Sequence, residues 1–159
     1  MLVPTALAIL IRELGEKMYL GNLSLDADGA CAVNLDKRFI INFQYRDSQD
    51  QLWLYADLGV PADGEAIYYD LLRGNLFWDA TKGATISLSL DDPSHIIMTI
   101  ALKWKAMDCS VMAKHLESFV NTVEDWSTFI AASSSSGNGI DMTPQNQTQA
   151  QNLQNQRVF

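Results

Sequence analysis

Few residues in this sequence have the types and spacing that catalysis or metal binding requires. The two histidines, His95 and His115, belong to no His-x-His or His-Glu-x-x-His pattern, so neither has neighbouring ligands with which to hold a metal ion. The two cysteines, Cys31 and Cys109, form no Cys-x-x-Cys pair and are too few for a disulfide framework. Their isolation is typical of small buried side chains in a reducing compartment. We therefore expect no metal site.

Three short segments resemble functional motifs only in part. Residues 26–29, Asp-Ala-Asp-Gly, begin like a calcium loop but lack the later ligands, and Asp and Gly are also common turn formers. The serines at 133–136 belong to no Gly-x-Ser-x-Gly elbow, and Gly-Asn-Gly at 137–139 precedes no helix that could bind a phosphate. The sequence therefore predicts no enzyme and no cofactor. A small enzyme is the alternative, and it would depend on His95 or His115.

Composition and charge narrow the class of protein. With 159 residues, 48% of them hydrophobic, the chain has about the length of one globular domain. Its net charge of −8 opposes binding to nucleic acid or to an anionic membrane surface, because both are negatively charged. No segment reaches the ~18 consecutive apolar residues of a membrane span, and no basic start precedes the apolar residues 1–11 as in a secretory signal. We expect a cytoplasmic protein.

Hydrophobic periodicity predicts a helix and then three strands in the first half of the chain. Residues 7–18 place apolar side chains at helical spacing, whereas residues 30–35, 38–46 and 51–58 alternate apolar with polar side chains. Turn-forming residues separate the three strands by intervals short enough for hairpins. The three strands therefore form an antiparallel meander.

The second half of the chain continues with a helix, a hairpin and a final helix. We expect helices over 65–78 and 108–130 and strands over 84–90 and 95–104, joined by a turn at 91–94. The fold class is therefore α+β: two layers, an antiparallel sheet and three helices, in the order α-β-β-β-α-β-β-α.

The end of the chain differs in composition from the rest. Residues 132–159 are rich in Ser, Gln and Asn and cannot bury enough apolar area to offset about 1–2 kcal/mol of backbone entropy per residue. We expect residues 1–131 to form one folded domain and residues 132–159 to form a disordered tail.

Apolar side chains exceed what one face of the sheet needs. Strand faces that would normally point to water carry five of them: Ile40, Val33, Trp53, Tyr55 and Ile97. Either the three helices cover this surface between them, or a second subunit or a bound polypeptide buries part of it. The sequence leaves both possibilities open.

The order of several short motifs gives the chain a resemblance to a known family. The matching segments are Leu-x-Leu-Asp-x-Asp-Gly-x-Cys at 23–31, Ala-Asp-Leu-Gly at 56–59 before Pro61, Leu-Leu-Arg-Gly-Asn at 71–75, Gly83 before a strand, the turn at 91–92, and Phe119 with Trp126 in the last helix. Together with the opening amphipathic helix, these make the chain resemble the class I type III secretion chaperones, the Tir-chaperone (CesT-like) family. The resemblance extends from about residue 5 to residue 131.

This resemblance implies a non-catalytic, ATP-independent homodimer of the bacterial cytosol. Members of the family bind the N-terminal segment of one or more secreted effectors and keep it soluble and competent for secretion. An extended peptide can add a strand to a sheet edge and place alternate side chains in apolar pockets. The resemblance also suggests the ATPase of the export apparatus as a further partner. A different adaptor or regulatory binding module on the same α+β plan is the alternative.

The resemblance also indicates which residues meet partners. In the family, the dimer contact falls chiefly on the second helix and the strand beside it, and effector pockets are lined by the first helix and the sheet. The corresponding dimer candidates are Ile67, Tyr68, Leu71, Leu72 and Asn75. The corresponding effector-binding candidates are Leu7, Ile11, Phe39, Ile41, Trp53 and Tyr55. For each dimer candidate, the core of its own subunit is the alternative.

Overall fold

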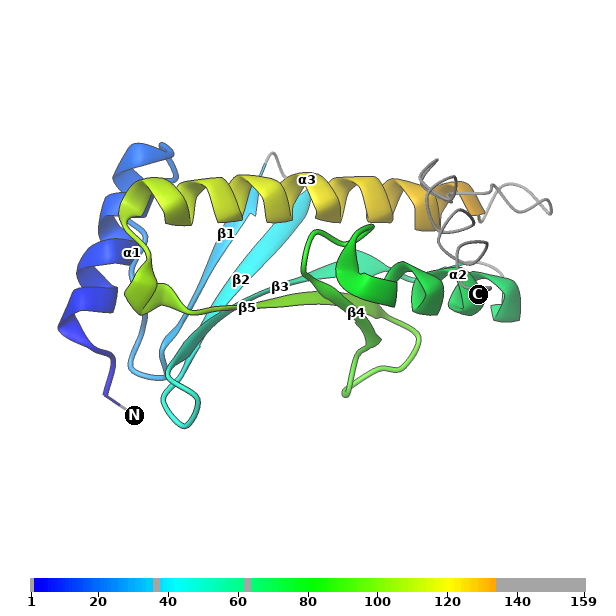
Figure 1. Ribbon diagram of the computed structural model, residues 1–159, viewed down its shortest axis with the longest axis horizontal. Coiled ribbons are helices and arrows are strands. Elements are labelled where there is room, and N and C mark those ends of the chain that lie inside the picture. The colour runs from blue at the N-terminus through cyan, green and yellow to red at the C-terminus, as the bar shows by residue number, and fades with distance from the viewer. Residues whose placement is uncertain (1, 36–37, 62–63, 134–159) are drawn as a thin grey trace, which may run out of the picture.

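The computed structural model describes residues 2–35, 38–61 and 64–133, and its elements follow the order expected from the sequence (Figure 1). The helices are α1 (Thr5–Lys17), α2 (Gly64–Gly74) and α3 (Cys109–Ser133), with two 3-10 turns, η1 (Leu76–Trp78) and η2 (Trp104–Ala106). The strands are β1 (Ala30–Leu35), β2 (Phe39–Arg46), β3 (Gln51–Gly59), β4 (Thr85–Leu88) and β5 (Ile96–Leu102). The predicted α+β class and element order are confirmed.

The predicted tail falls almost entirely outside the described residues. Only its first two residues, Ala132 and Ser133, are described, and they end α3. Within the described part of the chain, none of the helices combines the length and apolar character that crossing a bilayer requires.

The five strands form one antiparallel sheet in the order β1-β2-β3-β5-β4. The central strand β3 pairs with β2 on one side and β5 on the other, so that Leu54 lies between Phe43 and Ile100. β1 and β4 are the two edges of the sheet. The meander expected from the first three strands is confirmed, and the later hairpin β4–β5 extends it.

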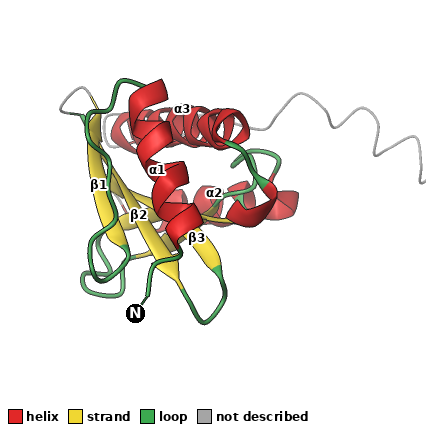
Figure 2. Ribbon diagram, turned by 90° about the vertical axis from the view of Figure 1, so that its left-hand side faces the viewer, coloured by secondary structure: helices red, strands yellow, loops and turns green. Residues whose placement is uncertain are grey.

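All three helices lie on one side of the sheet (Figure 2), and the core forms between them. Alternation along the strands turns Phe43, Leu54 and Met98 toward the helices, where each is buried. α3 runs over the sheet and packs against α1, whose Leu7 and Ile11 are fully buried. Among the described residues, no helix covers the opposite face of the sheet, which we call the outer face.

One apolar residue expected on the outer face belongs to the core. Val33 is buried, because it pairs directly with Ile41 and directly paired residues of an antiparallel sheet lie on the same face. The expectation for Val33 was therefore wrong. The other four apolar residues expected there are not buried: Ile40, Trp53, Tyr55 and Ile97.

The second helix ends at Gly74 and does not continue to Trp78 as the sequence predicts. The side chain of Asn75 turns toward β4, where Nδ2 donates to the carbonyl oxygen of Ile86 at 3.0 Å and Oδ1 accepts from the amide of Ile86 at 2.8 Å. These two bonds tie the end of α2 to an edge strand. The sequence prediction continued past this end, because Leu76 keeps the helical i, i+4 spacing from Leu72.

A contact with α3 also fixes the end of α2. Gly74 lies against the indole ring of Trp126, where an added Cβ would come within 2.4 Å of Cη2. The Nε1 group of Trp126 donates to the carbonyl oxygen of Ala80 at 3.2 Å. A single side chain of α3 therefore holds both the end of α2 and the loop that follows it.

Replacing Asn75 with alanine should lower the free energy of unfolding by about 1–3 kcal/mol, because the backbone groups of Ile86 lose their partners. Denaturant unfolding followed by circular dichroism measures the change. Asn121→Ala, at an exposed position of α3, is the matched control and should stay within about 0.5 kcal/mol of wild type. Equal stabilities for the two variants would show that the Asn75 bonds do not hold β4.

Candidate functional site

The most exposed group of large apolar side chains lies on α2 and η1. Leu72 is 68% exposed, Tyr69 70% and Phe77 78%. We define the α2 surface as the five exposed apolar residues of these elements: Tyr69, Leu72, Leu76, Phe77 and Trp78. A group of exposed apolar residues of this kind on a globular domain is a candidate for contact with another protein.

The backbone of η1 is held in an uncommon conformation that displays its aromatic residues. Phe77 and Trp78 have φ values of 58° and 57°, in the left-handed region that costs of order 1–3 kcal/mol for a residue other than glycine. Trp78 Nε1 donates to Thr85 Oγ1 at 3.2 Å, and the Trp78 carbonyl oxygen accepts from the amide of Gly83 at 3.1 Å. These bonds hold the backbone of η1 in one conformation, and this conformation exposes the rings of Phe77 and Trp78.

The edge strand β4 lies next to α2 (Figure 1) and adds to this end of the molecule. One side of β4 pairs with β5, while its other side ends the sheet. Leu88, the last residue of β4, is 47% exposed. Exposed apolar side chains therefore occur beside an edge strand, although the Asn75 side chain already bonds the backbone groups of Ile86 on that strand.

The dimer candidates occupy different environments. Ile67 and Leu71 are buried in the core of the chain itself, and Tyr68 is half-buried. Asn75 uses its side chain to hold β4. Leu72 alone among the five is largely exposed.

Sequence reasoning missed Tyr69, Leu76, Phe77 and Trp78 as surface residues. A signal was present in the run Leu-Phe-Trp at 76–78. Three successive residues of a helix span about 200° of its circumference, so a single buried stripe cannot hold all three. The run therefore indicated exposure whichever way the helix turned.

The effector-binding candidates are also divided by the structure. Leu7, Ile11 and Ile41 are fully buried in the core between the helices and the sheet and offer no surface to a partner. Phe39, at the start of β2, is half-buried, and the guanidinium carbon of Arg38 lies 5.2 Å from its ring centre. The remaining two candidates lie together on the outer face.

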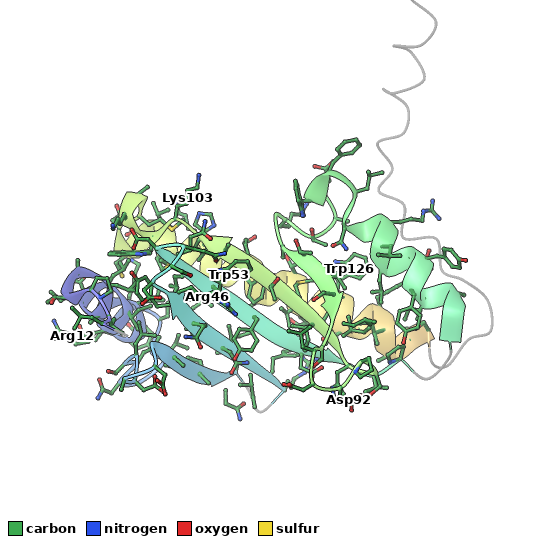
Figure 3. All side chains as sticks on the ribbon, turned by 90° about the horizontal axis from the view of Figure 1, so that it is seen from below. Arg12, Arg46, Trp53, Asp92, Lys103 and Trp126 are labelled. Atoms are coloured by element: carbon green, nitrogen blue, oxygen red, sulfur yellow. The ribbon has the colours of Figure 1, made fainter. Side chains whose placement is uncertain are left out.

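These two residues, Trp53 and Tyr55, form an aromatic ridge along the central strand (Figure 3 labels Trp53). Tyr55 is 37% exposed and Trp53 half-buried. Trp53 Nε1 donates to Gln49 Oε1 at 3.1 Å, and the guanidinium carbon of Arg46 lies 5.9 Å from the Trp53 ring centre. The ridge is therefore a second exposed aromatic group, separate from the α2 surface.

A third feature is a shallow depression at the end of α1. It has a volume of about 490 Å³ and opens to solvent between the helix and the loop that follows it. Its lining residues are Arg12, Gly15, Glu16, Tyr19, Gly21 and Asn22. Tyr19 is almost fully exposed at its rim.

The titratable residues singled out in the sequence do not converge on a catalytic arrangement. His95 Nδ1 lies 2.6 Å from Asp57 Oδ2, which joins the start of β5 to the end of β3. Ser89 bonds to His95 only through the backbone, its amide donating to the His95 carbonyl oxygen at 2.9 Å, and no serine or cysteine side chain in the described ranges bonds to the imidazole of His95 or His115. Nor do those ranges contain a group of three or more His, Cys, Asp and Glu side chains that could hold a metal ion.

Cys31 is a poor nucleophile in this setting. Burial, with a smaller effect from Asp26, raises the pKa of Cys31 to about 11. The thiol of Cys31 therefore remains protonated at neutral pH, whereas the thiolate is the reactive form.

A charged cluster closes the β2–β3 hairpin against η2. Lys105 Nζ bonds to Asp50 Oδ2, and the Tyr45 hydroxyl donates to Asp50 Oδ1 at 3.1 Å. The bond from Lys105 is the main reason that the pKa of Asp50 lies below its ordinary value, and it raises the pKa of Lys105. The cluster fixes the hairpin from which Arg46 and Trp53 extend.

Acid should weaken this cluster. Because the folded-state pKa of Asp50 is lowered, its stabilising effect is complete above the unfolded-state pKa of about 3.9 and disappears as the pH falls through the folded-state value. Asp50→Asn should therefore lower Tm at pH 7 and reduce the loss of Tm below about pH 4.

Thermal unfolding followed by circular dichroism across this pH range tests the expectation. Asp28→Asn, in an exposed turn, is the control and should follow the wild-type curve. Parallel curves for wild type and Asp50→Asn would show that the cluster contributes nothing to the acid dependence.

A comparison against known families identifies the family of the chain. The model of the Tir chaperone protein (CesT) family matches residues 9–127. The chain belongs to this family. The match covers all of the strands, the whole of α2 and most of α1 and α3, and the resemblance inferred from the motifs is thereby confirmed.

Solved structures with the same fold agree with the family. The ExsC–ExsE complex contains a chain 18% identical to this one, with a TM-score of 0.70, and the match covers 82% of this chain and 97% of that chain. The Yersinia pestis type III secretion chaperone SycH, in complex with a stable fragment of YscM2, is 23% identical with a TM-score of 0.61, covering 75% and 98%. The HopA1–SchA chaperone–effector complex gives 13% identity, a TM-score of 0.66, and coverage of 80% and 99%.

A search of curated protein sequences gave no match to this CesT-family chain. At the identities of the three solved structures, the likeness shows that the fold is shared.

Proposed function

We propose that this CesT-family chain is a type III secretion chaperone of the bacterial cytosol. In this function it binds the N-terminal region of one or more effectors as a homodimer and keeps that region soluble and competent for secretion without ATP. The α2 surface carries the proposal, because it is an exposed apolar group that a single subunit leaves uncovered. The chain acts by binding alone and catalyses no reaction.

The α2 surface is our candidate for the contact between two subunits. A two-fold dimer brings the same patch of both subunits together, which suits a compact group centred on Leu72 with an edge strand beside it. Tyr and Trp side chains contribute most to such contacts because they bury a large area with few rotatable bonds. Ile67 and Leu71 support α2 from within the subunit.

The outer face is our candidate for contact with the effector. Trp53 and Tyr55 offer aromatic area there, whereas Phe39 lies on the helix-facing side of β2 and packs against the core. Leu7, Ile11 and Ile41 lie in the core on the other side of the sheet, where they pack α1 against it. Having two surfaces on different elements allows one subunit to bind its twin and a client at the same time.

Two neighbouring leucines separate the dimer contact from the core. Leu72→Asp should convert dimers to monomers with an unchanged circular dichroism spectrum, because a charge would be buried at the contact between subunits. Leu71→Asp should instead lower the free energy of unfolding by about 3 kcal/mol or more, because Leu71 is buried within the subunit.

Light scattering after size exclusion measures the mass, and denaturant unfolding measures the stability. Leu2→Asp, at an exposed leucine before α1, is the matched control and should remain dimeric. A dimeric Leu72→Asp protein would exclude the α2 surface as the subunit contact.

Co-expression tests the function itself. The chain should co-purify with the tagged product of a neighbouring gene, and with its N-terminal segment alone, when ATP is absent throughout. Removing that segment should abolish the complex. A monomeric chain that retains none of the neighbouring gene products would contradict the proposal.

A further inference from the structure

The outer face has an ordered pattern of side chains that follows from the strand register. Trp53 on β3 pairs with Gln44 on β2 and with Ala101 on β5. Tyr55 pairs with Asn42 and with Thr99 in the same way. On the β5 side, the direct neighbours of the aromatic ridge are therefore the small side chains of Ala101 and Thr99. An apolar side chain of a partner can pack over them and against the edges of the two rings.

Two cations lie at the β2–β3 hairpin end of this ridge. Arg46 pairs with Gln51 on β3, and Lys103 follows Leu102, which pairs with Leu52. Arg46 and Lys103 therefore flank Gln51 from the two neighbouring strands, with their Cα atoms about 10 Å apart from the spacing of strands. Figure 3 shows Arg46, Trp53 and Lys103 together on the face that is seen from below.

Neither cation is neutralised within the described residues. Arg46 and Lys103 have no carboxylate within 4.0 Å, whereas the nearby Lys105 is bonded to Asp50. Asp47, which follows Arg46, directs Oδ1 to the amide of Ser48 at 2.8 Å. In a chain of net charge −8, this corner of the outer face is a local positive site next to aromatic rings.

The Trp53 ring is held in place before any partner arrives. Gln49 accepts its indole N–H, and Arg46 lies over its ring. A side chain fixed in this way loses little conformational freedom on binding, which favours affinity. Aromatic residues with arginine beside them are also the composition most enriched in binding sites for proteins.

We propose that this corner binds a client segment in which a carboxylate lies close to a large apolar side chain. The carboxylate binds between Arg46 and Lys103, and the apolar side chain packs against Trp53 and Tyr55. This inference rests on the proposed function and specifies the chemistry of the client. It excludes clients with a basic residue at that place, because like charges repel there.

Charge complementarity favours this occupant over nucleic acid and over a second copy. The net charge of −8 repels nucleic acid as a whole. A second copy has the exposed and more apolar α2 surface available. A short client segment can place one carboxylate at the positive corner without bringing an acidic domain against the chaperone.

The test uses two peptides that differ only at two positions, acetyl-Gly-Ser-Leu-Glu-Leu-Glu-Ser-Gly-amide and the same peptide with lysine for glutamate, which reverses the charge. The four tryptophans give indole N–H signals in two-dimensional NMR, and Trp53→Phe identifies the Trp53 signal. The glutamate peptide should shift the Trp53 signal in a saturable way, and the lysine peptide should not. Added salt should weaken the effect.

A double charge reversal, Arg46→Glu with Lys103→Glu, should weaken binding of the glutamate peptide by about tenfold. The matched control is Lys82→Glu with Lys114→Glu, which changes the net charge equally at exposed sites on a loop and on α3 and should bind as wild type does. Equal shifts for both peptides, no shift of Trp53, a shift at Trp78 alone, or full binding by the double reversal would each overturn the proposal.

The same variants in the co-expressed complex distinguish this inference from the proposed function. If wild type and the double reversal retain the client equally, the positive corner is not its binding site, although the chaperone function stands. If wild type retains no client, the proposed function itself fails. Loss of the client only in the double reversal supports both.

Discussion

The contact of Gly74 with the Trp126 ring determines where α2 lies, and most of the functional surface depends on it. Any side chain at residue 74 would clash with the indole, so only glycine allows α2 to lie this close to α3. Trp126 also bonds to the loop after η1, and Asn75 bonds to β4. These contacts end the helix at Gly74 and turn the following aromatic residues outward.

This placement explains why the subunit exposes apolar side chains that it cannot cover. The core under α3 is filled by the sheet and by α1, and α2 contributes only one side, through Ile67 and Leu71, to it. The other side of α2 continues into the turn that presents Phe77 and Trp78 in left-handed conformations. Backbone strain of this kind persists only where surrounding bonds enforce it, and it is concentrated at functional sites.

The two exposed surfaces differ in chemistry, which suits two different partners. The α2 surface consists of aliphatic and aromatic side chains on a helix and turn beside a strand edge. The outer face combines the aromatic ridge with Arg46 and Lys103. An apolar patch suits a lasting contact between identical subunits, whereas a charged and aromatic site discriminates among clients.

The sequence by itself determined the order of elements, the antiparallel sheet and the family, because periodicity and turn residues act over short distances. It did not determine which member of a stripe faces the core. Leu71 and Leu72 are adjacent and chemically identical, yet one is buried and the other exposed. Only the tertiary structure decided this, since the burial of a side chain depends on which distant elements, such as Trp126 and β4, pack against its helix.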